Sequence, residues 1–254
     1  MSTAPTLFTG RQPKDEAYCS ALPKFGAAVP PLPDPQSVWS CTDLVAQTLN
    51  QKSIAKNFPI LSNDRFGCCT ISGLAHHITI HAAIGSPART VIPSDQEVTN
   101  LYFRLTGGAD NGLPLSTALQ AGMKGLLGGY KIAANVSVDH TNMKEIKQAI
   151  QFCGGIYIGF ATTRDTVPQF QNGQPWTVTN SRTQGGHCVV LTGWNDHDQT
   201  FDALSWGGLQ KAKFDWLTTY CDEIHAVITE DLAAFDHDTV DSIVQRMKGV
   251  PGFR

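Results

Sequence analysis

The sequence lacks the features of membrane-spanning, exported and nucleic-acid-binding chains. No stretch approaches the ~20 consecutive apolar residues that cross a bilayer. The first residues, MSTAPTLFTGRQPKDEAYC, show no basic segment followed by an apolar one, so we expect no secretory signal peptide. The formal net charge is only −3, which gives no electrostatic reason to expect nucleic acid or an anionic membrane as a partner.

The chain also lacks the cysteine pattern of a disulfide framework. Its seven cysteines are an odd number without regular spacing, and a reducing compartment is the simplest interpretation. Metal motifs are weak as well. His77 and His81 have the spacing of zinc ligands on one helix, but no HExxH glutamate or third ligand is evident. We therefore predict neither a metal nor a cofactor.

The first half of the chain shows helical patterns. Apolar residues recur at helical spacing from Thr70 to about Ala83 and predict a buried helix. Ser94 with Glu97 three residues later forms a capping box, which predicts the start of a second helix. LSTALQAGMKGLL predicts a third, and CTDLVAQTLNQ a short earlier one. Prolines at positions 30, 31, 33 and 35 predict an extended path before it.

The second half changes to a strand period. KIAANVSV and GGIYIGFAT read as strands on either side of a helix within NMKEIKQAIQFC. HCVVLTGW and TFDALSW predict a hairpin, and EIHAVITEDL predicts a further strand. With 254 residues the chain can form one large domain or two lobes.

We therefore predict an α+β fold with a helical first lobe, an antiparallel β-rich second lobe and a cleft between them. Four blocks are expected: an N-terminal extended strap at 1–62, the helical lobe at 63–130, the β-rich lobe at 131–235, and a C-terminal helix or tail at 236–254. The strap is expected to brace the lobes. A flexible leader and a removable inhibitor are the alternatives.

Two residues stand in the contexts that a thiolate nucleophile and its base need. Cys69 lies where a turn-rich loop gives way to a helical pattern, and His187 follows two glycines at the start of a predicted strand. A helix N-terminus and a neighbouring imidazolium both lower a thiol pKa. We therefore expect Cys69 to be a reactive thiolate, with Cys68 as the alternative nucleophile.

The order of these motifs resembles the papain-like cysteine peptidases. That family has a Gln six residues before its cysteine and a Gly two before it, where this chain has Asn63 and Gly67. Its histidine strand and its Asn-Ser-Trp-Gly motif match GGHCVVLTGW and LSWGG in order. The resemblance covers about residues 55–230 and is closest to a divergent bacterial and phage-type branch with a Gly-x-Cys-Thr motif.

The resemblance implies a role for each matching residue. Cys69 is the implied nucleophile, His187 the base, Asn63 an oxyanion donor, and Trp206 the shield of the imidazole. The family's asparagine corresponds to Leu204, so Asp202 becomes the candidate that orients the imidazole, because strand residues two apart share a face. On this reasoning Ser205 faces the opposite side.

The resemblance predicts a cysteine peptidase or amidase acting on a peptide or protein through an acyl-enzyme. Two alternatives stay open: an acyl-transfer enzyme of transglutaminase or peptide-ligating type, and an inactive protein that keeps the fold for binding or structure, such as a phage or virion component. We expect no nucleic-acid or membrane partner and a cytoplasmic or virion-associated location. Homo-oligomerisation and virion assembly are left open.

Overall fold

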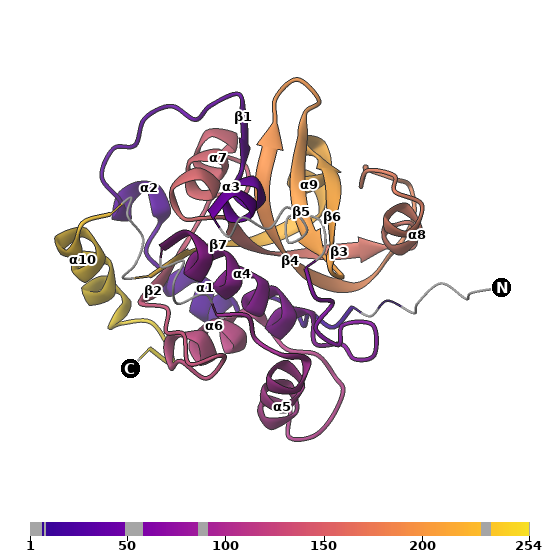
Figure 1. The fold of residues 1–254 in the computed structure, drawn as a ribbon, viewed down its shortest axis with the longest axis horizontal. Helices are drawn as coiled ribbons and strands as arrows, with labels where there is room; N and C mark the ends of the chain where they lie inside the picture. Colours follow the sequence, from indigo (N-terminus) through magenta and orange to yellow (C-terminus); the bar gives the residue numbers. More distant parts are fainter. Residues whose placement is uncertain (1–6, 8, 49–57, 86–90, 230–234, 254) are drawn as a thin grey trace.

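The computed structural model describes residues 7, 9–48, 58–85, 91–229 and 235–253. Its helical half contains three of the helices that the sequence predicted, and they gather on one side of the strands (Figure 1). These helices are α4 (Cys69–Gly85), α5 (Asp95–Leu105) and α6 (Leu115–Met123). The capping box that begins α5 is confirmed, since Ser94 and Glu97 each accept from the other's backbone N–H.

The strands form one antiparallel sheet in the order β2-β7-β3-β4-β5-β6, with the short β1 also paired to β4. Their bounds are β1 (Val38–Ser40), β2 (Ala134–Ser137), β3 (Ile156–Thr163), β4 (Thr183–Asn195), β5 (Thr200–Ser205), β6 (Gly208–Lys213) and β7 (Cys221–Ile228). The predicted α+β class is therefore confirmed. The sequence missed β1 and β6, which are short or alternate without a strong apolar face.

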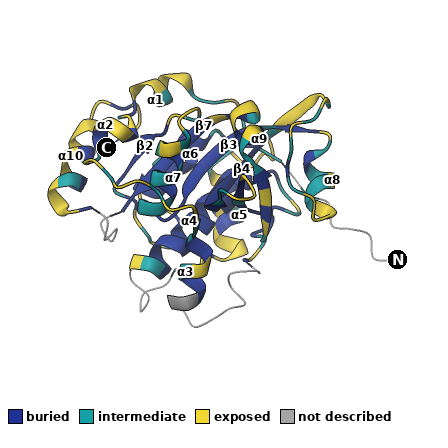
Figure 2. Ribbon diagram, turned by 90° about the horizontal axis from the view of Figure 1, so that it is seen from above, coloured by how far each residue is buried: buried dark blue, intermediate teal, exposed yellow. Residues whose placement is uncertain are grey.

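Helix α4 is the element on which both halves pack. It is buried along its length from Cys69 to Ala83 (Figure 2). Apolar and small residues lie on all sides of this helix, and several of its buried polar side chains bond inside the fold, such as Ser72 with the Leu61 carbonyl and His76 with the Pro59 carbonyl. The Tyr157 hydroxyl on β3 donates to the Thr70 carbonyl at 2.6 Å, and a Cβ on Gly73 would lie 3.3 Å from Cys188 Sγ on β4. The first turn of α4 thus lies directly against the sheet.

The N-terminal block contains helices as well as extended chain. These are α1 (Glu16–Ala21), α2 (Phe25–Ala28) and α3 (Cys41–Thr48), of which only α3 was predicted. The proline-rich residues 29–36 have no regular structure, as the sequence predicted. Tyr18 and Phe25 are buried in the core, so the described part of this block packs as a component of the fold.

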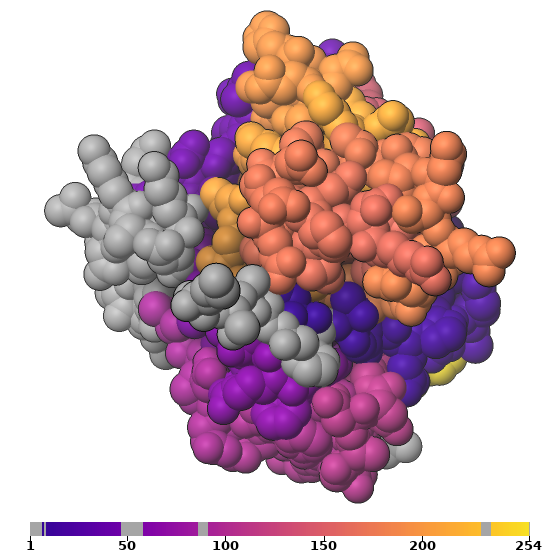
Figure 3. Space-filling view, turned by 90° about the vertical axis from the view of Figure 1, so that its right-hand side faces the viewer, coloured from indigo at the N-terminus to yellow at the C-terminus, as the bar shows by residue number. Residues whose placement is uncertain are grey.

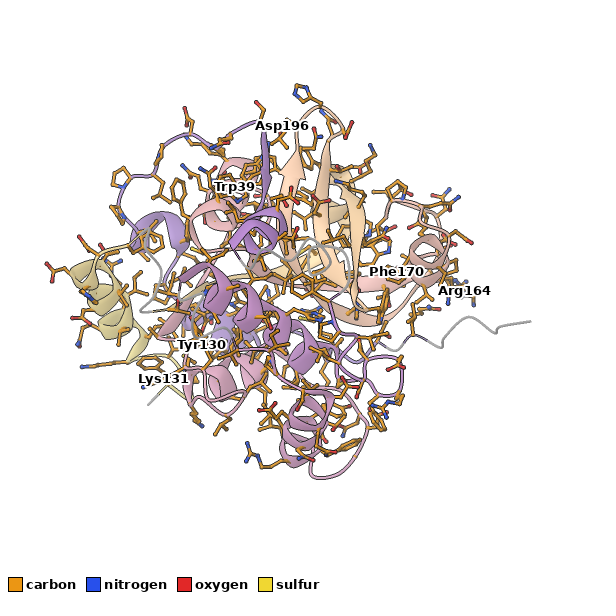
Figure 4. The ribbon with its side chains drawn as sticks, viewed as in Figure 1. Trp39, Tyr130, Lys131, Arg164, Phe170 and Asp196 are labelled. Atoms are coloured by element: carbon orange, nitrogen blue, oxygen red, sulfur yellow. The ribbon has the colours of Figure 1, made fainter. Side chains whose placement is uncertain are left out.

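The remaining helices cover the sheet and its ends. They are α7 (Met143–Phe152), α8 (Thr166–Gln171), α9 (Phe214–Tyr220) and α10 (His237–Met247). Phe170 of α8 lies beside the neighbouring strands (Figure 4), with its ring 5.0 Å from that of Trp206. Within the described ranges, no helix combines the length and apolar character needed to cross a membrane.

Candidate active site

A tight loop leads into α4 and places Cys69 at its first residue. Leu61 and Ser62 both adopt positive φ angles, 56° and 61°, which turn the chain sharply before the helix. Asn63 is buried, and its side-chain Nδ2 donates to the Phe66 carbonyl at 3.0 Å. The Gly67 N–H donates to Asp110 Oδ1 at 2.9 Å, which ties the loop to the segment before α6.

The Cys69 thiol lies between α4, β4 and the N-terminal segment. The residue is only 1% exposed, and the backbone N–H groups of Gly10 and Cys188 both approach the sulfur. Burial raises the pKa of this thiol to about 11, although those N–H groups oppose the rise. The expected low pKa is therefore not found in this arrangement, because the burial of the thiol outweighs the N–H groups at its sulfur.

His187 lies on β4, one residue before the Cys188 backbone that the thiol approaches. Its Nε2 is 2.9 Å from Ser205 Oγ, and its ring stacks on Trp206 with centroids 4.3 Å apart and planes at 14°. Burial lowers the pKa of His187 to about 3. Among the described residues its Nδ1 has no hydrogen-bond partner, so no bond through this nitrogen joins it to Cys69.

The imidazole contact differs from the one the sequence suggested. Asp202 lies opposite Lys211 in the β5–β6 register, and its carboxylate pairs with the Lys211 ammonium at 2.5 Å. Ser205, expected to face away, instead reaches His187. The reason is that β5 alternates its faces and ends at a turn in which Trp206 has φ 45°, which brings Ser205 and Trp206 together around the ring.

Residues 9–12 run between the two halves of the molecule, beside Cys69. The Arg11 N–H donates to the Gly186 carbonyl at 3.0 Å. A short parallel bridge joins Arg11 to Leu113, in which the Gln12 N–H donates to the Leu113 carbonyl at 3.0 Å and the Leu113 N–H donates to the Gly10 carbonyl at 2.9 Å. A Cβ on Gly10 would overlap the Gly67 carbonyl, so only glycine fits at this approach. Indigo N-terminal residues are visible between the magenta helical half and the orange strand-rich half (Figure 3).

The Arg11 side chain enters a buried acidic pocket in the β-rich half. Its Nη2 lies 2.8 Å from Glu223 Oε2 and 2.7 Å from Asp222 Oδ1. The side chains of Arg11 and Glu223 are 4% and 1% exposed, whereas that of Asp222 is 52% exposed. Burial opposes ionisation of Glu223, but hydrogen bonds from His225 and Arg11 outweigh it and hold the pKa of Glu223 at about 2.

Two histidine-containing clusters bear on metal binding. Cys19, Glu223 and His225 bring three potential ligand atoms within 4.8 Å of one another, but Glu223 Oε1 already accepts from Cys19 Sγ at 3.3 Å and from His225 Nε2 at 2.8 Å. The rings of His77 and His81 meet edge to face at 4.5 Å inside the core, and burial lowers the pKa of both.

The structure thus stacks His187 on Trp206 and places Cys69 against the backbone of Cys188, the residue after His187, with Asn63 in the loop that leads into α4. Ser205 and the Arg11–Glu223 pair were missed. Arg11 and Glu223 are 212 residues apart, and a lone arginine near an N-terminus carries no sequence signal for such a pairing. The serine was visible within LSWGG, but its orientation was not.

Solved structures share this architecture. The chain resembles xylellain, a cysteine protease from Xylella fastidiosa, with TM-score 0.59 and 14% identity over 89% of this chain and 96% of that one. It resembles proCathepsin B S9 from Trypanosoma congolense with TM-score 0.62 and 12% identity over 88% and 87%. The clostridial cysteine protease Cwp84 matches with TM-score 0.51 and 13% identity, over 74% of this chain and 56% of that one.

These likenesses establish a papain-like fold, with a helical part and an antiparallel sheet part, and they establish the fold alone. No protein-family model matches the chain, and no curated protein matches its sequence.

Proposed function

We propose that this papain-like fold carries a cysteine peptidase or amidase, with Cys69 as nucleophile and His187 as general base. The observation that carries the proposal is the junction itself. Cys69 begins α4 with its sulfur against the backbone N–H of Cys188, and the adjacent His187 is stacked on Trp206 and hydrogen-bonded to Ser205. A nucleophile beside a base that a third group orients is the arrangement that acyl transfer requires.

The chemistry follows from the hydrogen-bonding roles. The Ser205 hydroxyl can accept from Nε2–H of His187, which leaves the lone pair of Nδ1 to take the thiol proton. The Cys69 sulfur then attacks the substrate carbonyl carbon, and the imidazolium returns its proton to the departing amine. Water hydrolyses the resulting thioester, with His187 again as base.

The oxyanion formed at each step needs donors placed in advance. The Cys69 backbone N–H at the start of α4 is one candidate. The Asn63 side-chain amide, in the loop that leads into the helix, is the second. Trp206 covers the imidazole and limits the access of water to its hydrogen bond with Ser205.

The N-terminal segment covers the site in this arrangement. With Cys69 only 1% exposed and the Gly10 N–H at its sulfur, a substrate carbonyl cannot reach the thiol until residues 9–12 move aside. The proposed substrates are peptides or proteins, since a polypeptide segment now lies against the Cys69 sulfur. The seven free cysteines support a reducing location, cytoplasmic or within a virion.

A second candidate function is a binding or structural role without catalysis, including assembly into a virion. The protonated, buried Cys69 thiol and the leucine at position 204 favour this candidate.

The test uses Gly10→Ala, because the added Cβ would overlap the Gly67 carbonyl and displace the segment. We expect this variant to hydrolyse fluorogenic peptides faster than the wild type. Adding Cys69→Ala or His187→Ala lowers the rate by ~10³-fold or more, whereas adding Cys68→Ser does not. A folded Gly10→Ala protein without hydrolysis, or one whose rate depends on Cys68, contradicts the proposal.

A further inference from the structure

The pocket around Arg11 has the properties of a recognition site for a guanidinium group. Its base is Glu223, whose side chain is 1% exposed, and Asp222 closes its outer side. One wall is Gly159 of β3, where a Cβ would lie 2.7 Å from Arg11 Cζ. Any side chain at position 159 would therefore exclude the flat group, and the glycine leaves room for it.

The carboxylate of Glu223 is held in place by residues other than Arg11. Oε1 accepts from His225 Nε2 and from Cys19 Sγ, which leaves Oε2 directed at the guanidinium. Asn135 in turn contacts His225 Nδ1 at 3.1 Å and accepts from the Tyr18 hydroxyl at 2.6 Å. This network keeps the pocket preorganised when Arg11 leaves, and a buried carboxylate with one unpaired oxygen strongly favours a replacement cation.

The pocket is aligned with the candidate nucleophile by the segment that now fills it. Gly10 lies over the Cys69 sulfur, and the next residue, Arg11, extends its side chain to Glu223 while its N–H donates to the carbonyl of Gly186. Gly186 directly precedes His187. An extended peptide that followed the path of residues 9–12 would therefore place one side chain in the acidic pocket within a residue or two of the carbonyl that Cys69 attacks.

We infer that this pocket selects arginine-containing peptides as substrates, and that the arginine of the substrate takes the place of Arg11. The inference rests on the proposed function for the cleavage step, but not for the binding step. An arginine side chain fits this pocket because one guanidinium nitrogen bridges the two carboxylates and Gly159 leaves room for the flat group.

Binding is tested without catalysis by chemical rescue of full-length Arg11→Ala, which empties the pocket. Low-millimolar ethylguanidinium should raise its melting temperature, whereas equal concentrations of N-ethylurea or sodium chloride should not. The double variant Arg11→Ala/Glu223→Gln should show no such rise. Arg11→Gln provides a second host if the alanine variant does not fold. Equal responses of the single and double variants overturn the inference.

Selectivity is tested with paired peptides that carry arginine or its neutral isostere citrulline. We expect Arg11→Ala to cleave the arginine peptide with a kcat/KM at least tenfold higher than that for the citrulline peptide. In the double variant Arg11→Ala/Glu223→Gln, the ratio of the two kcat/KM values should be close to one. If the ethylguanidinium rescue occurs but no peptide is cleaved, the pocket stands and the peptidase proposal fails. Cleavage of both peptides at equal rates with and without Glu223 overturns the inference and leaves the peptidase standing.

Discussion

The Cys69–His187 junction and the Arg11–Glu223 pocket lie against the same four N-terminal residues, 9–12, yet their buried titratable groups are in opposite charge states. At the junction burial keeps both titratable groups neutral, with the thiol pKa at about 11 and the imidazole pKa at about 3. In the pocket burial is overcome, and both Arg11 and Glu223 are ionised. The difference is the number of partners, since Glu223 accepts three hydrogen bonds.

The N-terminal segment therefore has two separate roles. The Gly10 backbone covers the neutral Cys69 thiol, and the Arg11 side chain anchors the segment through a buried ion pair. The stability of the segment should therefore depend on the pocket, and the reactivity of the thiol on the segment.

The largest expected effect comes from removing the anchor. Glu223→Ala leaves the Arg11 guanidinium buried without its main partner, which should lower the free energy of unfolding by about 3–5 kcal/mol. The matched control is Asp222→Asn, because Asp222 is half exposed and its pairing should contribute less than about 1 kcal/mol. Urea denaturation of the three proteins measures both. Equal losses in the two variants would show that burial does not set the strength of this pair.

A smaller effect distinguishes the two regions by pH. His187 is neutral when folded, with a pKa of about 3 against an ordinary 6.5, so the unfolded chain binds more protons and stability falls as pH drops below 6.5. Between pH 7 and 5 this histidine should cost about 2 kcal/mol. His187→Gln should therefore lose about that much less stability over this interval in urea denaturation at the two pH values.

Glu223 provides the internal contrast for that measurement. Its folded pKa is depressed to about 2 from 4.5, so its stabilising contribution is complete above pH 4.5 and is lost as pH falls towards 2. Glu223→Gln should leave the difference between pH 7 and pH 5 almost unchanged. If Glu223→Gln changed the stability difference between pH 7 and pH 5 as strongly as His187→Gln does, this would contradict the assignment of the two charge states.

The sequence predicted more of the framework than of the site. Apolar periodicity and the Ser94 capping box located α4 and α5 because these signals are local and each helix carries its own pattern. The strands that the sequence missed are short, and β1 exists only because β4 pairs with it. The division into blocks at 1–62, 63–130, 131–235 and 236–254 stays a prediction.

The candidate nucleophile and base were evident from local context, but their environment was not. Burial under Gly10 reverses the direction in which the Cys69 pKa moves, and this burial depends on a segment about sixty residues away in the chain. The orientation of the Ser205 side chain towards His187 depends on how β5 ends at Trp206. Such features arise from tertiary packing, which spacing along one strand does not encode.

The smallest effect separates Ser205 from Asp202 as the partner of the imidazole. In a Gly10→Ala background, Ser205→Ala should slow Cys69 acylation about tenfold, which corresponds to the ~1.4 kcal/mol of one lost hydrogen bond. Asp202→Ala should change the rate by less than about twofold, because its carboxylate pairs with Lys211. Single-turnover acylation measures both variants, and a larger loss from Asp202→Ala would transfer the positioning role to Asp202.

On the proposed function, Cys69 is a nucleophile that the N-terminal segment keeps covered and protonated. This claim is tested most directly by mapping which cysteine a thiol-directed peptide electrophile modifies in the wild type and in Gly10→Ala. We predict slow labelling of the wild type, with Cys19 as the partly exposed comparator, and fast labelling of Cys69 alone in Gly10→Ala that is abolished by His187→Ala. Fast labelling of Cys68, or a Cys69 that stays inert in a folded Gly10→Ala protein, would contradict the claim.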